Sequence, residues 1–132
     1  MKIGPLPHTC QLFLCVCTLG CSNTGQRVID CREAGLRAGQ KYPDEKGYHT
    51  KDIHFNAKDQ KCYLSVAGTE SGPEGGSTSY DAIIDVDENR EISQCTSSHV
   101  HGAGADEWSC YKGMEIVTRE SFQTFLKLRM EQ

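Results

Sequence analysis

Residues 75–110 (GGSTSYDAIIDVDENREISQCTSSHVHGAGADEWSC) decide the fold that this sequence predicts. Residues 80–86 (YDAIIDV) alternate between two sets of side chains, which is typical of a strand with both faces partly covered. A polar turn at residues 87–90 leads into a returning strand at residues 91–98, and residues 107–111 predict a last short strand. The stretch therefore predicts antiparallel β-structure.

The chain before this stretch adds further strands. Strands are predicted at residues 52–56 (DIHFN) and 61–67 (KCYLSVA), with a turn at residues 57–60 between them. Glycine and serine dominate residues 68–79, which therefore predict a loop.

The segment that precedes these strands predicts little regular structure. Residues 28–31 (VIDC) predict a short strand or an extended arm, and residues 32–40 predict one or two helical turns at most, because glycine disfavours a helix. Residues 41–51 predict a loop with a turn at Tyr42 and Pro43.

Residues 118–132 (TRESFQTFLKLRMEQ) predict a helix. Thr118 is a favourable N-cap residue, and Glu120 suits the positive end of the helix dipole. The apolar side chains fall near one face: Phe122, Phe125, Leu126 and Met130. We expect this face to dock on the sheet, so the predicted fold class is α+β, an antiparallel β-sheet of four or five strands packed on a helix.

The first 22 residues resemble a secretory signal peptide. Lys2 precedes an apolar centre at residues 12–19 (LFLCVCTL), and small residues follow it. A lipoprotein anchor at Cys21 is the rival interpretation, but Leu19 stands one place too close to that cysteine. We therefore expect a secreted protein whose single domain spans residues 23–132. No apolar run approaches the roughly 18 residues of a membrane span, so no membrane partner is expected.

The eight cysteines divide at the expected cleavage site, although the fate of Cys21 stays open. Cys31, Cys62, Cys95 and Cys110 remain in the mature chain, and four cysteines in a small secreted domain predict two disulfides. Three pairings are possible, and the spacing alone does not choose between them. These four contain no C-x2-C pair, which argues against a zinc site.

Charge and motif patterns exclude several functions. A formal net charge of −4 argues against a uniformly basic nucleic-acid binder, although not against a local basic patch. The sequence Asp85-x-Asp87-x-Asn89 begins like a calcium loop, but Arg90 occupies the place where that loop requires glycine. No metal or cofactor is expected.

The pair His99-x-His101 is the strongest candidate for chemistry. Both side chains would point to the same side of a strand, which suits metal ligation, but no third ligand is fixed by spacing. A solvent-facing pair and a histidine that transfers protons are the other interpretations. The aromatic residues, Trp108 among them, suit either base stacking or the core.

The order of these features resembles the fungal guanyl-specific ribonucleases. That family has a Tyr-Pro-His turn, a GGSPGADRVV-like strand and a THTGASGNNFV-C ending. Tyr42 and Pro43, the run GGSTSYDAII at residues 75–84, and HVHGAG at residues 99–104 occupy the same places, with Cys110 as the closing cysteine. The resemblance implies a microbial-ribonuclease-like sheet and helix, with the family's N-terminal helix short or absent.

The resemblance carries over only part of the family's catalytic set. Tyr42 stands for the turn tyrosine, and Asp44 replaces the histidine after Tyr-Pro. The general-base glutamate falls near Tyr63 and the phosphate-holding arginine near Ala82, so both functions are missing. The general-acid histidine is kept as His99. Cleavage of RNA needs a base, an acid and a cation for the phosphate.

The resemblance also implies a disulfide between Cys31 and Cys110, which would leave Cys62 to pair with Cys95. A degraded site of this kind is similar to that of the ribonuclease-like secreted effectors of plant-pathogenic fungi, which are thought to bind host RNA or host proteins. The resemblance thus implies a fungal virulence effector, extracellular or delivered into host cells, without catalytic activity and monomeric.

The expected partner is RNA or a host protein, and the expected RNA-binding residues are Tyr42, His49, His99 and His101. The alternative is a weakly active endoribonuclease with His99 as general acid, Asp44 or His49 as base, Tyr42 in the site and a lysine at the phosphate. A third interpretation is a disulfide-stabilised secreted protein with no role in nucleic-acid binding.

Overall fold

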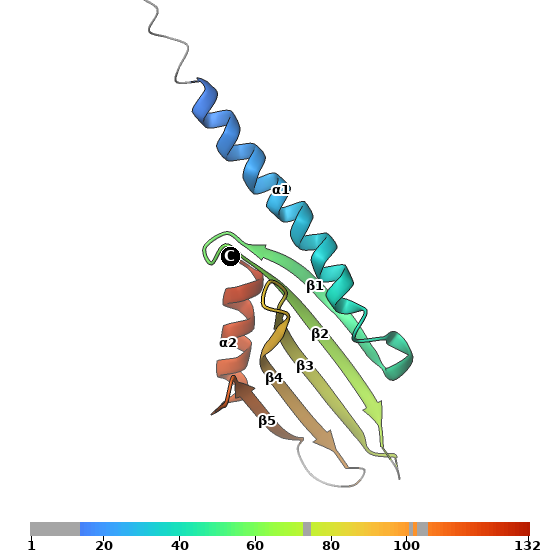
Figure 1. The fold of residues 1–132 in the computed structure, drawn as a ribbon. Helices are drawn as coiled ribbons and strands as arrows, with labels where there is room; N and C mark the ends of the chain where they lie inside the picture. The colour runs from blue at the N-terminus through green and yellow to red at the C-terminus, as the bar shows by residue number, and fades with distance from the viewer. Residues whose placement is uncertain (1–13, 73–74, 101, 103–105) are drawn as a thin grey trace, which may run out of the picture.

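The computed structural model describes residues 14–72, 75–100, 102 and 106–132. Within these residues, six strands form one antiparallel sheet in the order of the sequence, and two helices pack against it (Figure 1). The elements are α1 (Leu14–Gly39), the 3-10 turn η1 (Asp44–Lys46), β1 (Tyr48–Asn56), β2 (Lys61–Ser71), β3 (Ser77–Asp85), β4 (Arg90–His99), β5 (Glu107–Lys112), β6 (Glu115–Val117) and α2 (Arg119–Met130). The α+β class and the antiparallel sheet are confirmed.

The sheet has six strands rather than the predicted four or five, because Glu115–Val117 adds β6, and the predicted strands differ mainly in their ends. Strands β2 and β3 reach into residues 68–79, predicted as a loop, because these residues pair with each other: Thr69 lies opposite Ser79, and Ser71 lies opposite Ser77. Strand β1 begins at Tyr48 rather than at residue 52. The sheet thereby extends well beyond the short hairpins that the sequence pattern indicates.

The N-terminal part of the described chain is a helix, not an arm. Residues 28–31 lie inside α1, so the predicted strand is wrong, and so is the expectation of a short or absent N-terminal helix. The helix lies close to the sheet at Gly35 because glycine has no Cβ atom; a Cβ there would lie 2.4 Å from Cγ2 of Ile53. The helix is stabilised by contact with β1 and β2 rather than by its own propensity.

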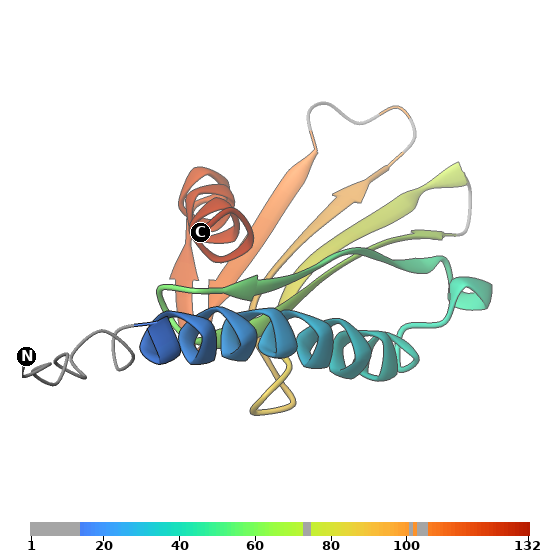
Figure 2. The same ribbon diagram turned by 90° about the horizontal axis from the view of Figure 1, so that it is seen from above.

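Apolar side chains form one cluster on each face of the sheet. On the face that α1 covers, here called the α1 face, the buried residues are Leu64, Val66, Ala82 and Ile84. On the face that α2 covers, here called the α2 face, they are Tyr63, Ile83, Cys95, Cys110 and Phe122. Figure 2 shows α1 and α2 on different sides of the sheet.

Helix α2 is held at both ends. The Oγ1 atom of Thr118 accepts a hydrogen bond from the Ser121 amide at 3.1 Å, which confirms the predicted N-cap. At the other end, Asn56 is 1% exposed and donates from Nδ2 to the carbonyl groups of Leu128 and Arg129, at 3.0 and 3.1 Å. The predicted docking of the helix on the sheet is confirmed.

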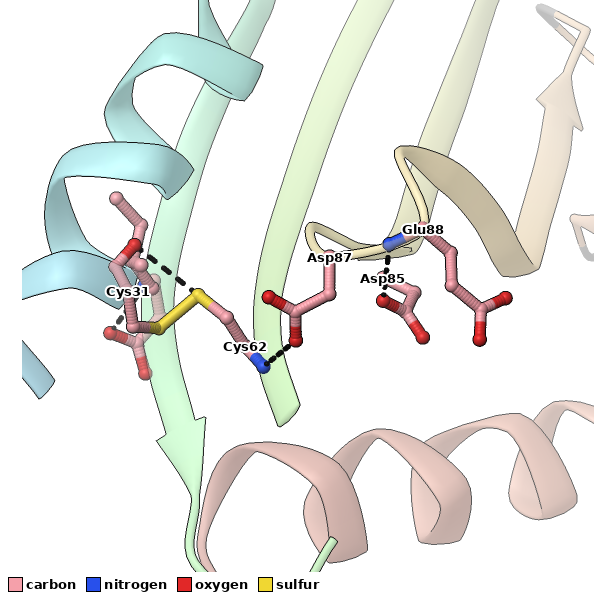
Figure 3. Close-up of a disulfide and its surroundings, with 7 residues drawn as sticks. Cys31, Cys62, Asp85, Asp87 and Glu88 are labelled. Carbon is pink, nitrogen blue, oxygen red and sulfur yellow. Dashed lines mark hydrogen bonds between the residues drawn. A yellow bond between two sulfur atoms is a disulfide. The ribbon is translucent and has the colours of Figure 1, made fainter. Parts of the chain in front are cut away.

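The cysteines form two disulfides as predicted, but with a different pairing. Cys31 pairs with Cys62, and Cys95 pairs with Cys110, so the Cys31–Cys110 bond that the resemblance implies is wrong. The reason is the sheet itself: Cys31 lies in α1 on one face, whereas Cys110 belongs to the cluster on the other. Figure 3 shows the Cys31–Cys62 bond between α1 and β2. No helix in the described part of the chain is both long and apolar enough to cross a membrane.

Candidate functional site

Part of the α2 face is not covered by α2. The helix lies over one end of the sheet and leaves the other end open, where β2 ends, β3 begins and β4 ends (Figure 1). Side chains alternate between faces along a strand, so the register with Cys95 and Cys110 identifies those that share this face. We call this region the open end; its residues are Ala67, Thr69, Ser79, Asp81, Ser97 and His99, with Trp108 at its border with α2.

His99 has a carboxylate partner at the open end. It is the last residue of β4, and its Nδ1 atom lies 2.7 Å from Oδ1 of Asp106. Both side chains are almost half exposed, at 49% and 44%. When His99 is neutral and Nδ1 carries the proton, the carboxylate orients the ring and leaves Nε2 as an acceptor. In that state Nε2 is the ring nitrogen left to contact a ligand, because Nδ1 is engaged by Asp106.

Lys51 and Asp81 form a second ion pair next to the open end. Lys51 lies at a bulge in β1, where the register shifts between Thr50 and Asp52. Its Nζ atom is 3.3 Å from Oδ1 of Asp81, which lies in β3. The sequence analysis missed this pair, because the bulge and the contact between β1 and β3 leave no local pattern in the sequence.

Trp108 is covered on one side by Arg119. The guanidinium carbon of Arg119, in the first turn of α2, lies 3.7 Å from the ring centroid. Arginine and tryptophan attract each other in this geometry through the electron density of the ring face. The ring face under Arg119 is therefore closed to a nucleotide base, and the cation of Arg119 is already engaged.

Tyr42 does not share a site with His99. It packs with the cluster on the α1 face, and its ring meets that of Tyr48 edge-on with centroids 6.2 Å apart. Desolvation, followed by the negative charge of Glu91, raises the pKa of Tyr42, so the phenol keeps its proton. The sheet lies between Tyr42 and His99, and one substrate atom cannot contact both.

The other predicted residues are also apart. His49 is exposed in β1 and lies opposite Ala67, whereas His99 in β4 lies opposite Ser77. From His49, His99 is three strands across the sheet and four residues along it, so their Cα atoms are roughly 20 Å apart. Asp44 opens η1 on the connection from α1 to β1, where its backbone carbonyl accepts the amide of Gly47 at 2.8 Å. His101 lies outside the described residues.

The two positions that the resemblance assigns to the missing groups lie on opposite faces. Tyr63 is 3% exposed beneath α2 and donates its hydroxyl proton to Asp59 at 3.1 Å. Ala82 is 1% exposed on the α1 face. Neither position reaches His99. The open end thus carries two separate ion pairs and several hydroxyl groups, which can form hydrogen bonds to a ligand but do not form a catalytic cluster.

Two clefts of about 560 Å³ flank α1, one on each side of the helix. The first lies toward the turn between β3 and β4 and has charges of both signs. There Lys61 contacts Asp85 at 2.7 Å and Glu88 at 2.6 Å, and these hydrogen bonds raise the pKa of Lys61 and lower that of Glu88.

The same cleft is built around the Cys31–Cys62 disulfide. Asp87 accepts the amide of Cys62 at 2.9 Å, and Asp85 accepts the amide of Glu88 at 3.0 Å (Figure 3). These acidic residues thereby hold the turn in place. Among the described residues, no group of three or more His, Cys, Asp or Glu side chains is placed to bind a metal ion.

The second cleft runs between α1 and the outer side of β1. Its helix wall includes Val28, Arg32 and Leu36, and its strand wall consists of residues 50–55.

No family model, curated protein or solved structure matches this chain. The geometry of these surfaces is therefore the basis for a functional proposal.

Proposed function

We propose that this chain is a secreted ribonuclease-like effector that lacks ribonuclease activity and binds a host protein. The observation that supports it most directly is the state of the cations at the open end: Lys51 contacts Asp81, and Arg119 stacks on Trp108. A phosphate group would have to compete with both internal contacts. Since cleavage also needs a base close to the acid, the distance between His49 and His99 supports a binding function.

The charge of the mature chain supports a protein partner over RNA. All 18 acidic residues lie after residue 22, as do all the basic residues except Lys2. Removal of a signal peptide would make the formal charge more negative, and RNA binding draws most of its affinity from neutralised phosphates. The two disulfides are typical of proteins that function in an oxidising compartment.

The test is cleavage and binding of total RNA by the oxidised chain, beside a His99→Ala variant. We expect no cleavage above that of the variant, and RNA affinity no tighter than about 10⁻⁶ M near physiological salt, as for non-specific binding. Crosslinking in plant extract, followed by mass spectrometry, should recover a protein partner. Cleavage that His99→Ala abolishes would replace this proposal with the weak ribonuclease.

RNA binding without cleavage is the second candidate function, and the exposed His99–Asp106 pair favours it. A protonated His99 would offer a hydrogen bond to a phosphate, and the hydroxyl groups of Ser79 and Thr69 would lie on the same face. Submicromolar RNA affinity that falls with salt and is weakened by His99→Ala would support this candidate against a protein partner.

A further inference from the structure

We propose that the cleft between α1 and the outer edge of β1 is a groove for an extended segment of the partner protein, which adds to the sheet as a strand beside β1. This inference rests on the proposed function, because it takes the partner to be a protein, and it names the surface and the chemistry. Strand addition of this kind uses backbone hydrogen bonds for affinity and side-chain pockets for selectivity.

The cleft follows the backbone of β1. All six consecutive residues from 50 to 55 line it. Successive side chains point to opposite faces of a sheet, so a cleft that touches every residue of a strand must run along the strand's edge. Helix α1 lies along β1 in both views of the fold (Figures 1 and 2), and it forms the other wall.

The outer edge of β1 offers backbone groups to another strand. Strand β1 is the first in the sheet and pairs with β2 on one side only, among the described strands. The amide of Ile53 faces the outer edge, where it donates to Oδ1 of Asp52 at 2.9 Å, and an added strand would have to displace this carboxylate. By the alternation of the ladder, Phe55 also directs its amide and carbonyl groups outward.

The available edge is short and has defined ends. The bulge at Lys51 interrupts the strand at one end, and at the other end the amide of Ala57 donates to the carbonyl of Gln132 at 3.3 Å. Residues 52–56 remain between them. This length suits a segment of about five residues, and a bulge and a lysine are features that restrict pairing along an edge.

The helix wall has side chains for the segment to contact. Val28, Arg32 and Leu36 are four residues apart and share one side of α1. Val28 is 49% exposed and Leu36 is 57% exposed, and Ile53 and Phe55 contribute apolar area from the strand. Burial of this apolar area by a ligand would be favourable.

Arg32 selects the charge of the segment. It lies between Val28 and Leu36, and it has no hydrogen-bond or ion-pair partner among the described residues. A carboxylate is the group that a guanidinium binds best, by two parallel hydrogen bonds. The structure therefore points to an extended segment with apolar side chains at alternate positions and an Asp or Glu facing Arg32.

The experiment selects ligands from a displayed library of random nine-residue peptides with the oxidised full chain. Selected peptides should be apolar and carry a carboxylate. Their affinity for the Arg32→Glu variant should be about tenfold or more weaker than for the parent chain, and methylation of alternate peptide nitrogens should also weaken binding to the parent chain. Arg37→Glu is the matched control, because Arg37 lines the other cleft. Bound peptide should slow hydrogen exchange at the amide of Phe55.

Several outcomes would overturn the groove. One is a selection in which no peptide binds the parent chain better than it binds the Arg32→Glu variant. Another is peptide binding that does not weaken when the peptide's backbone nitrogens are methylated. Concentration-dependent dimers that Arg32→Glu dissolves would assign the edge to a second copy. If the parent chain and the Arg32→Glu variant capture the same host protein equally, the proposed function stands and the groove is rejected. If the groove binds peptides but no host protein is captured, the groove stands and the proposed function is rejected.

Discussion

Cys31 is the first residue along α1 whose described side chain is buried, and its disulfide joins it to Cys62 in β2. Side chains at residues 23–30 are exposed, whereas Cys31 is 5% exposed and Cys62 is 2% exposed. The bond thus lies at the point where the helix first meets the sheet (Figure 3). One covalent link sets the position of the helix wall of both clefts.

Removal of this bond should release α1. For the double variant Cys31→Ser and Cys62→Ser, we expect a loss of about 3–4 kcal/mol in the free energy of unfolding, as chain entropy predicts for a sequence separation of 31. Denaturant unfolding gives the energy, and limited proteolysis locates the change. The double variant Cys95→Ser and Cys110→Ser is the control. It should destabilise the chain without exposing α1 to protease.

A methyl group at Gly35 should disturb the contact between α1 and the sheet. Gly35→Ala places its Cβ 2.4 Å from Cγ2 of Ile53, and we expect a loss of about 1–3 kcal/mol. Gly25→Ala is the matched control in the same helix: nothing lies within 4 Å of its Cβ, so helix propensity should raise stability by up to about 1 kcal/mol. Equal midpoints of urea unfolding for the two variants would show that the close approach is absent.

Asn56 should contribute more to stability than any exposed polar residue of β1. Its side chain donates to two carbonyl groups of α2, and its Oδ1 accepts the amides of Lys58 and Asp59, at 3.1 and 3.0 Å. Asn56→Ala leaves these partly buried groups without their side-chain partner, and we expect a loss of about 3 kcal/mol. Thermal unfolding measures it, with Thr50→Ala as the exposed comparison. A change below about 1 kcal/mol would contradict this assignment.

Tyr42 should act in packing rather than in chemistry. Because its hydroxyl is not near His99 and its ring packs with Tyr48, Tyr42→Phe should change stability by less than about 1 kcal/mol, whereas Tyr42→Ala should cost about 2–4 kcal/mol. Neither variant should change RNA binding at equal folded fraction. A selective loss of RNA binding in Tyr42→Phe would restore Tyr42 to a ligand site.

The strand and helix patterns predicted most of the sheet, because they depend on local alternation. Strands β2 to β5 and helix α2 follow periodicities that are visible in the sequence, and Thr118 is an N-cap by composition and in the structure. Helix α1 was missed because Gly35 and Gly39 lower its propensity, although the same glycines allow it to approach Ile53 and Thr50. Tertiary contact outweighs propensity there.

The site residues were harder to predict, because the faces of a sheet depend on register. The sequence indicated His99, and the structure places the carboxylate of Asp106 beside it. It could not show that Tyr42 lies on the other face, nor that Lys51 pairs with Asp81 across β2. A one-residue shift reverses the face of every side chain in a strand.

The order of the sheet has a consequence for oxidative folding. Every strand pairs with the strand next to it in the chain, so the sheet has a low contact order and each hairpin can close without distant segments. Cys95 and Cys110 lie opposite each other in neighbouring strands, whereas Cys31 reaches Cys62 only after a helix has docked. We expect the Cys95–Cys110 intermediate to accumulate first, which would direct the remaining thiols away from mispairing.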